Sequence, residues 1–207
     1  MQRILAAFLV VWLTAALVPG PAAAEDTPSN RFSANMTDLK SSLKAFSETI
    51  DSYNRSIKEV TDFDVEAAKA KVAEIREQIR QLLEQLNDGS PLAKSQAELT
   101  RWIERNRRLV RTDSLLSSER KALLEAAWAQ RAEDIDKAGK EIVAVRKTLV
   151  DQLNRVVGDE TFLTQLLFLE KAGDAAKLIR QFLNDIKSFS DALRQRMDAL
   201  PVPAPGS

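Results

Sequence analysis

Apolar residues recur every three or four positions in two neighbouring segments of the chain. The first run comprises Leu39, Leu43, Phe46, Ile50, Tyr53, Ile57 and Val60. The second run comprises Val65, Ala68, Val72, Ile75, Ile79, Leu82 and Leu86. A spacing that averages about 3.5 residues places each run on one stripe of a helix, as in a coiled-coil seam. Because only residues 61–64 separate the runs, we expect helices over 36–60 and 65–87 that pair as an antiparallel hairpin.

A strong turn signal separates the second of these helices from a third. Residues 88–91 read Asp-Gly-Ser-Pro. Glycine suits the left-handed position after a helix, serine caps the next helix, and proline fits its first turn. We therefore expect a third helix from Pro91 to about Thr112, followed by a connection over 113–118.

A long fourth helix is expected to begin after Ser117 or Ser118 and to end near Val157. Glycine–aspartate pairs at 158–159 and 173–174 predict two further breaks, since glycine favours a helix end and aspartate caps the next helix. The last helix should then run from 174 to about 200. Gly139 lies inside the fourth helix, where we expect it to be tolerated at about 1 kcal/mol relative to alanine.

The predicted fold class is all-α: an elongated helical bundle of about five or six helices, built from antiparallel coiled-coil hairpins. We place this bundle at 36–200. Residues 25–35 lack periodicity and are expected to form a flexible tether that ends at Asn35, which can cap the first helix. The proline-rich residues 201–207 should form an extended tail.

The first 24 residues resemble an export signal. Arg3 precedes an apolar run from Ile4 to Val18, and small residues suited to cleavage follow at 22–24. The apolar run is shorter than the roughly 20 residues needed to span a bilayer. We therefore expect a cleavable signal peptide at 1–24 and a periplasmic or secreted mature chain without an integral membrane span; a retained membrane anchor is the alternative.

Composition excludes several classes of chemistry. The chain has no cysteine and no histidine, so it cannot form disulfides, thiolate metal sites or a catalytic Ser-His-Asp arrangement. Its 30 basic and 30 acidic residues give a formal net charge of zero, so no overall field attracts nucleic acid. The sequence gives no reason to expect a cofactor, a metal site or a nucleic-acid partner.

An arginine-rich segment of the third helix is the main candidate for binding. Arg101, Arg105 and Arg108 are spaced by four and three residues, so they share a helix face, and Trp102 lies among them. Arginine forks bind phosphate and carboxylate, which makes these four residues candidates for binding an anion or a partner. The alternative is a solvated face whose arginines pair with glutamates on a neighbouring helix.

The apolar stretch 162–169 is a second candidate, because such a stretch can insert into a membrane surface or a partner groove. We expect it instead to pack in the core against Trp128 or Trp102.

These patterns predict a protein that acts by binding other molecules rather than by catalysis. We expect an exported, non-enzymatic helical scaffold or adaptor that binds another protein or a second copy in the periplasm or cell envelope, because narrow seams on long helices are often completed by another chain. The alternative is a helical bundle that binds a small or lipidic anion, and a third hypothesis is a hydrolase of unknown type. Peripheral contact with the envelope is compatible with the first two.

Overall fold

The computed structural model describes residues 27–58 and 65–198. Within this part of the chain there are five helices and no strand, which confirms the predicted all-α class. The helices are α2 (Pro28–Lys58), α3 (Val65–Gln85), α4 (Pro91–Thr112), α5 (Ser118–Phe168) and α6 (Ala172–Asp198). The expected signal peptide, the linker 61–64 and the tail 201–207 lie outside the described residues.

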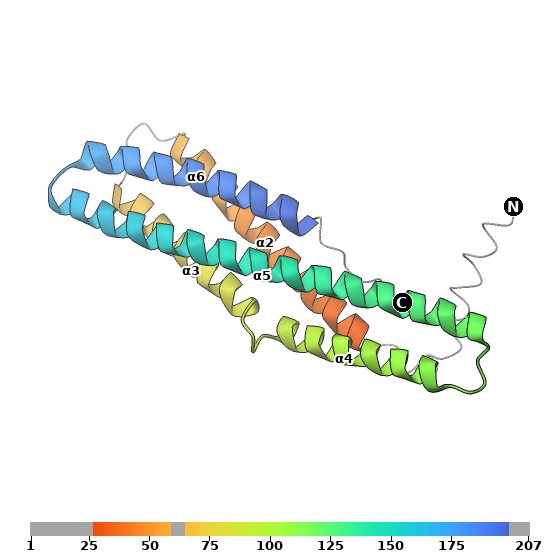
Figure 1. Cartoon of the computed structure of the whole chain (residues 1–207). Coiled ribbons are helices and arrows are strands. Elements are labelled where there is room, and N and C mark those ends of the chain that lie inside the picture. The colour runs from red at the N-terminus through yellow and green to blue at the C-terminus, as the bar shows by residue number, and fades with distance from the viewer. Residues whose placement is uncertain (1–26, 59–64, 199–207) are drawn as a thin grey trace, which may run out of the picture.

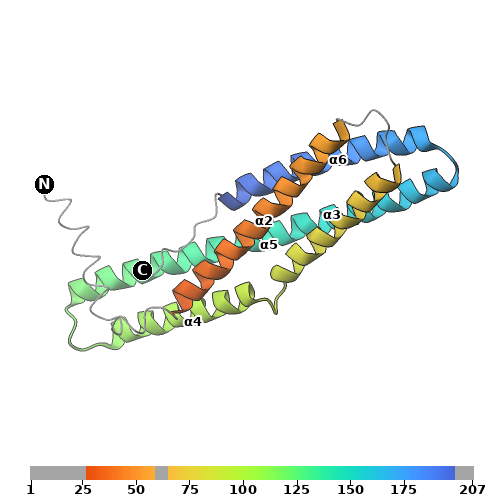
Figure 2. The same cartoon turned by 180° about the vertical axis from the view of Figure 1, so that it is seen from behind.

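The helices form an elongated bundle around α5 (Figure 1). With 51 residues, α5 is about 75 Å long and is the longest element of the described chain. Both α3 and α4 pack on α5, one after the other along its length, and α6 returns along its last part (Figure 2). α2 packs most extensively on α6 and α4.

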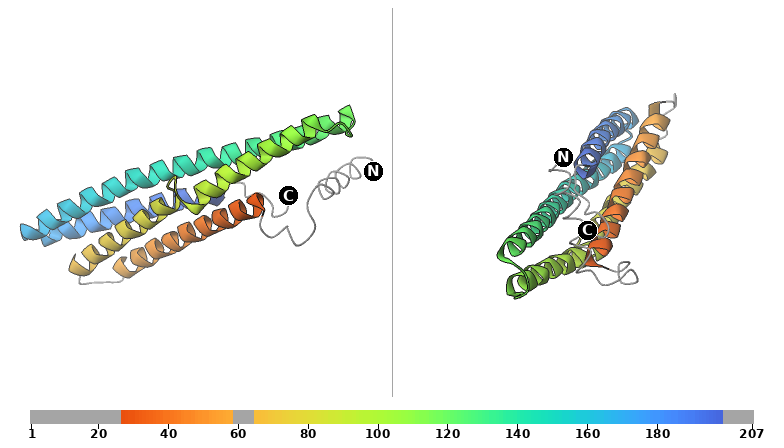
Figure 3. Two further views of the ribbon diagram at one scale, coloured as in Figure 1. Left: turned by 90° about the horizontal axis from the view of Figure 1, so that it is seen from below. Right: turned by 90° about the vertical axis from the view of Figure 1, so that its right-hand side faces the viewer.

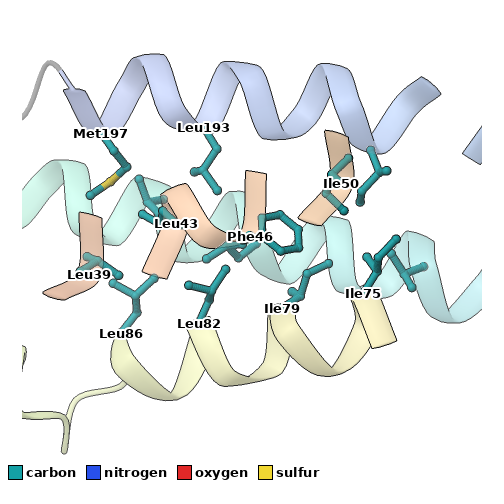
Figure 4. Packing of buried hydrophobic residues seen from close by; sticks show 14 of the residues in the cluster. Leu39, Leu43, Phe46, Ile50, Ile75, Ile79, Leu82, Leu86, Leu193 and Met197 are labelled. Atoms are coloured by element: carbon teal, nitrogen blue, oxygen red, sulfur yellow. The ribbon is translucent and has the colours of Figure 1, made fainter. Parts of the chain in front are cut away.

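The predicted apolar seams form the centre of this bundle. Ten of their residues are buried: Leu39, Leu43, Phe46, Ile50, Ala68, Val72, Ile75, Ile79, Leu82 and Leu86. Tyr53 is partly buried against the same core, and the side chain of Ile57 lies outside the described part. Leu193 and Met197 of α6 meet the seams of α2 and α3 (Figure 4). The arrangement is compatible with a hairpin of α2 and α3, but α2 packs more extensively on α6 than on α3.

The expected tether is partly wrong, because α2 begins at Pro28 and includes residues 28–35. Phe32 and Met36 are fully buried and extend the seam of Leu39 by steps of four and three. Asn35 therefore lies inside the helix and does not cap it. Its side-chain amide donates to the carbonyl of Pro91 at 3.2 Å and to Ser95 Oγ at 2.9 Å, which ties α2 to the start of α4.

The break expected at 158–159 is also wrong, because α5 continues to Phe168. Val156, Leu163 and Leu166 are all buried, so both sides of Gly158 are held in one helical register. Packing therefore overrides the local preference of glycine for a helix end.

The turn between α5 and α6 lies at 169–171, before the expected second break at Gly173. Glu170 adopts a left-handed backbone with φ of 58°, and the Lys171 N–H donates to the carbonyl of Leu166 at 2.9 Å. This hydrogen-bond pattern ends a helix in the usual Schellman manner, with glutamate at the position where glycine is common. Gly173 lies in the first turn of α6.

The predicted start signals of α4 and α5 are confirmed. Ser90 Oγ accepts from the N–H of Ala93 at 3.1 Å and caps α4, with Pro91 in its first turn. Ser117 Oγ accepts from the N–H of Arg120 at 3.3 Å and caps α5.

Candidate functional site

One end of the bundle is only two helices thick. Arg31 near the start of α2 pairs with Glu98 at 2.9 Å, and Arg196 near the end of α6 pairs with Glu141 at 2.9 Å. These ion pairs mark where α2 and α6 end along the molecule. Beyond them α4 and α5 project together (Figure 3). We call residues 99–131 the outer hairpin.

An aromatic pair joins the two helices of the outer hairpin. The rings of Trp102 and Trp128 meet edge to face, with centroids 5.1 Å apart and an interplanar angle of 77°. The guanidinium of Arg131 lies 4.8 Å from the centre of the Trp128 ring. Burial lowers the pKa of Arg131, although a guanidinium stays charged at neutral pH. Stacking on an indole face stabilises this half-buried cation.

The structure separates Trp102 from the arginines that surround it in sequence. Arg101, Arg105 and Arg108 are exposed, whereas Trp102 packs towards α5. Arg111 is the arginine of this segment that pairs with the neighbouring helix, through Glu125 at 3.3 Å. In the described part of the chain, Arg105 and Arg108 form no ion pair. The predicted pairing with glutamates therefore holds for Arg111 alone.

A small hollow lies beside the arginine face. It has a volume of about 250 Å³ and is lined by Glu104, Arg107, Arg108 and Arg111. Arg107 Nε is buried without a hydrogen-bond partner among the residues described. Three guanidinium groups around one hollow suit an anionic oxygen ligand.

The outer hairpin combines a positive surplus of charge with three exposed leucines. It carries eight basic and four acidic residues, whereas the other described residues include 21 of each sign. Leu109, Leu115 and Leu123 are 59%, 93% and 68% exposed. The hairpin therefore holds the whole positive surplus of the described chain, together with three exposed leucines.

A second exposed apolar feature runs along α5. Val143, Val150 and Val157 are 66%, 40% and 41% exposed and recur every seven residues. We call them the valine stripe. Seven residues are close to two helical turns, so the three side chains follow one side of α5.

The predicted packing of residues 162–169 against Trp128 or Trp102 is wrong. Because α5 is continuous, Phe162 lies 34 residues, or about 50 Å, from Trp128. Leu163 and Leu166 enter the core, whereas Phe162, Phe168 and Leu169 are exposed at the turn into α6. This turn is the opposite end of the bundle from the outer hairpin (Figure 1).

Ionisable side chains near that end are partly buried. Arg76 of α3 pairs with Glu160 of α5, and both side chains are mostly shielded from solvent. Burial raises the pKa of the neighbouring Asp159, the carboxylate of Asp185 raises it further, and Arg155 opposes the shift. A structural role explains this cluster, since Glu160 is already paired across the helix interface.

Gly139 lines a groove of about 420 Å³ where the turn between α3 and α4 meets α5. A Cβ atom at this position would lie 2.2 Å from Gln96 Nε2. The glycine thus makes room for a side chain of α4, a reason for glycine that the sequence did not reveal. At one edge of the groove, Arg146 pairs with Asp88 at 3.0 Å.

Residues 27–58 and 65–198 contain no group of His, Cys, Asp or Glu side chains that could hold a metal ion. None of the helices in these ranges is long and apolar enough to cross a membrane. Comparisons with protein families, with curated proteins and with solved structures found no match to this chain.

Proposed function

We propose that the chain is an exported, non-enzymatic helical scaffold or adaptor that acts through contacts of its helix surfaces in the periplasm or cell envelope. The observation that carries the proposal is the exposed apolar surface along α5. The valine stripe and Phe168 remain exposed on one side of this helix although a continuous core is already buried beneath it. Exposed apolar surface of this extent is typical of a contact site for another molecule.

The valine stripe suits a helix of another chain. β-branched residues that recur at one heptad position favour pairing between two helices. Covering three partly exposed valines contributes about 1 kcal/mol for each, so the stripe by itself supports a weak contact. Phe168 lies 11 residues, close to three helical turns, after Val157, so it offers additional area to the same partner.

The residue types also favour contact over catalysis. The chain lacks the two side chains, histidine and cysteine, that most often serve as general base or as an activated nucleophile. Among the described residues, the ion pair between Arg76 and Glu160 has the least exposed side chains; it links α3 to α5 and so has a structural role.

A charge substitution in the valine stripe tests the proposal. Val143→Glu, Val150→Glu and Val157→Glu together should abolish self-association in light scattering, or capture of a partner by crosslinking in intact cells. The matched control is Ser52→Glu, Gln181→Glu and Gln195→Glu, which adds the same charge at exposed positions on α2 and α6. The control should behave like the parent chain. An inert monomer that captures no partner in either assay would refute the proposal.

A second candidate function is the binding of a small anionic ligand in the hollow of the outer hairpin. The specific observation is the buried Nε of Arg107, which has no partner among the described residues, beside Arg108 and Arg111. Native mass spectrometry of the purified chain tests this candidate. A bound anion that is lost in Arg107→Ala supports it, and a clean unliganded mass counts against it.

A further inference from the structure

The exposed leucines of the two helices lie on one side of the outer hairpin. The ion pair between Arg111 and Glu125 joins α4 to α5 on the other side. Leu109 precedes Arg111 by two residues, and Leu123 precedes Glu125 by two. Since two residues turn a helix by about 200°, both leucines point away from the ion-paired side.

Basic side chains border these leucines. Arg105 lies one turn before Leu109, and Arg120 lies one turn before Leu123, so each arginine neighbours a leucine on the helix surface. The exposed Glu119 also lies one turn before Leu123, so one acidic side chain borders that leucine. Both arginines are exposed, and neither forms an ion pair within the part of the chain that the structure describes. Their charges are therefore available to an external anion.

The turn between α4 and α5 adds a third leucine at the tip. Leu115 is the most exposed of the three, and its backbone N–H donates to Asp113 Oδ1 at 2.8 Å, which holds the turn. We call Arg105, Leu109, Leu115, Arg120 and Leu123 the leucine–arginine face.

We propose that the leucine–arginine face binds the surface of a bilayer that contains anionic phospholipids, with its three leucines inserted among the head groups. The net charge of the hairpin favours an anionic surface, and guanidinium forks match the geometry of phosphate. Exposed leucines supply the apolar area that holds a basic segment at a membrane interface. This inference goes beyond the scaffold function and does not depend on a protein partner.

The shape of the outer hairpin favours a bilayer over an acidic protein as the binding partner. The leucines lie on a narrow projection, and a protein would need a complementary hollow to cover them. Lipid head groups rearrange around a projecting tip. The arginine-lined hollow of the hairpin includes Glu104 and Arg111, so it lies towards the ion-paired side rather than on the leucine–arginine face.

Vesicle binding tests the inference. The chain from Glu25 onward, which contains every described residue, is mixed with vesicles of phosphatidylglycerol and phosphatidylcholine, or of phosphatidylcholine alone. We expect sedimentation with the anionic vesicles at about 0.1 M salt and weaker binding at high salt. Each basic residue near an anionic membrane strengthens binding about fivefold, so Arg105→Glu with Arg120→Glu should weaken it at least about 30-fold.

Two further variants test whether the position of the charges matters and whether the leucines contribute to binding. Lys147→Glu with Arg194→Glu makes the same change in net charge at exposed positions on the body of the bundle, and it should retain most of the binding. Leu109→Ser, Leu115→Ser and Leu123→Ser together should abolish the binding that survives at high salt. Circular dichroism confirms that each variant is folded.

A second readout comes from fluorescence. After residue 24 the only tryptophans in the sequence are Trp102 and Trp128, and both lie in the outer hairpin. Their emission should change on anionic vesicles and stay constant on neutral ones. The inference is overturned if the chain ignores anionic vesicles at low salt, if the arginine variant binds like the parent, or if both charge variants lose binding equally.

Discussion

Gly158 provides a sharp test of the helix that organises the bundle. The structure places it in the interior of α5, exposed, with no described atom within 4 Å of an added Cβ. Its φ lies outside the left-handed range. Alanine should therefore fit without strain, and the gain is the full difference in helix propensity, about 1 kcal/mol.

The assay is urea unfolding followed by circular dichroism at the helical minimum. Gly158→Ala should raise the free energy of unfolding by about 1 kcal/mol, which corresponds to about 2–4 °C in melting temperature for a chain of this size. Gly139→Ala is the matched control, since it makes the same substitution in the same helix. There the new Cβ would lie 2.2 Å from Gln96 Nε2, so the amide must move and the gain should be smaller.

The opposite result is expected if the helix ends at Gly158. If 158–159 were a helix end with a left-handed glycine, alanine would be strained and Gly158→Ala would destabilise the chain. A lower unfolding midpoint for Gly158→Ala would therefore show that α5 is interrupted.

Three further substitutions test the packing and the electrostatics of the bundle. Burial and Asp185 raise the pKa of Asp159, so the folded state binds its proton more tightly than the unfolded state, and this carboxylate lowers stability at neutral pH. This loss of stability should disappear as the pH falls through the raised pKa of Asp159 towards the ordinary value of 3.8. Asp159→Asn should therefore be more stable than the parent chain at pH 7, and urea titrations at lower pH should show a smaller difference between the two. Asn54 is buried and its amide donates a hydrogen bond to the carbonyl of Leu183 at 3.2 Å. Asn54→Ala should therefore lower the unfolding free energy by about 1–2 kcal/mol. An unchanged unfolding midpoint would show that this hydrogen bond between α2 and α6 is absent. Ile75 is fully buried, so Ile75→Ala should lower the unfolding free energy by about 2–5 kcal/mol, whereas a loss below 1 kcal/mol would show that its side chain is not in the core.

Periodicity predicted the core well because burial and spacing are linked in a helix. The seam from Leu39 to Ile50 and the seam from Val72 to Leu86 are buried as expected. The turn before Pro91 was also predictable, because its capping residues act locally and independently of the rest of the fold.

The two wrong boundaries have a common physical origin. At 28–35 a single large apolar residue, Phe32, extends the seam, and the polar residues around it concealed the helix. At Gly158 a strong local signal for a break was overridden by buried leucines and valines on both sides. Local propensity amounts to about 1 kcal/mol, which tertiary packing readily exceeds.

The candidate site could be predicted only in part. The arginine-rich segment is visible in the sequence, but the exposure of Leu109, Leu115 and Leu123 depends on where α2 and α6 end relative to α4 and α5. Trp102 was expected to lie with the arginines. It contacts Trp128 instead, a pairing set by the register between two helices that no local pattern encodes.

Photocrosslinking in intact cells shows whether the exposed apolar surface of α5 makes contact with another protein in the envelope. A photoreactive residue at Val150 is compared with the same residue at Arg194, an exposed polar position on α6. We predict a discrete protein adduct, identified by mass spectrometry, from position 150 and none from position 194. No adduct at 150, or equal adducts at both positions, would show that this surface of α5 makes no specific contact.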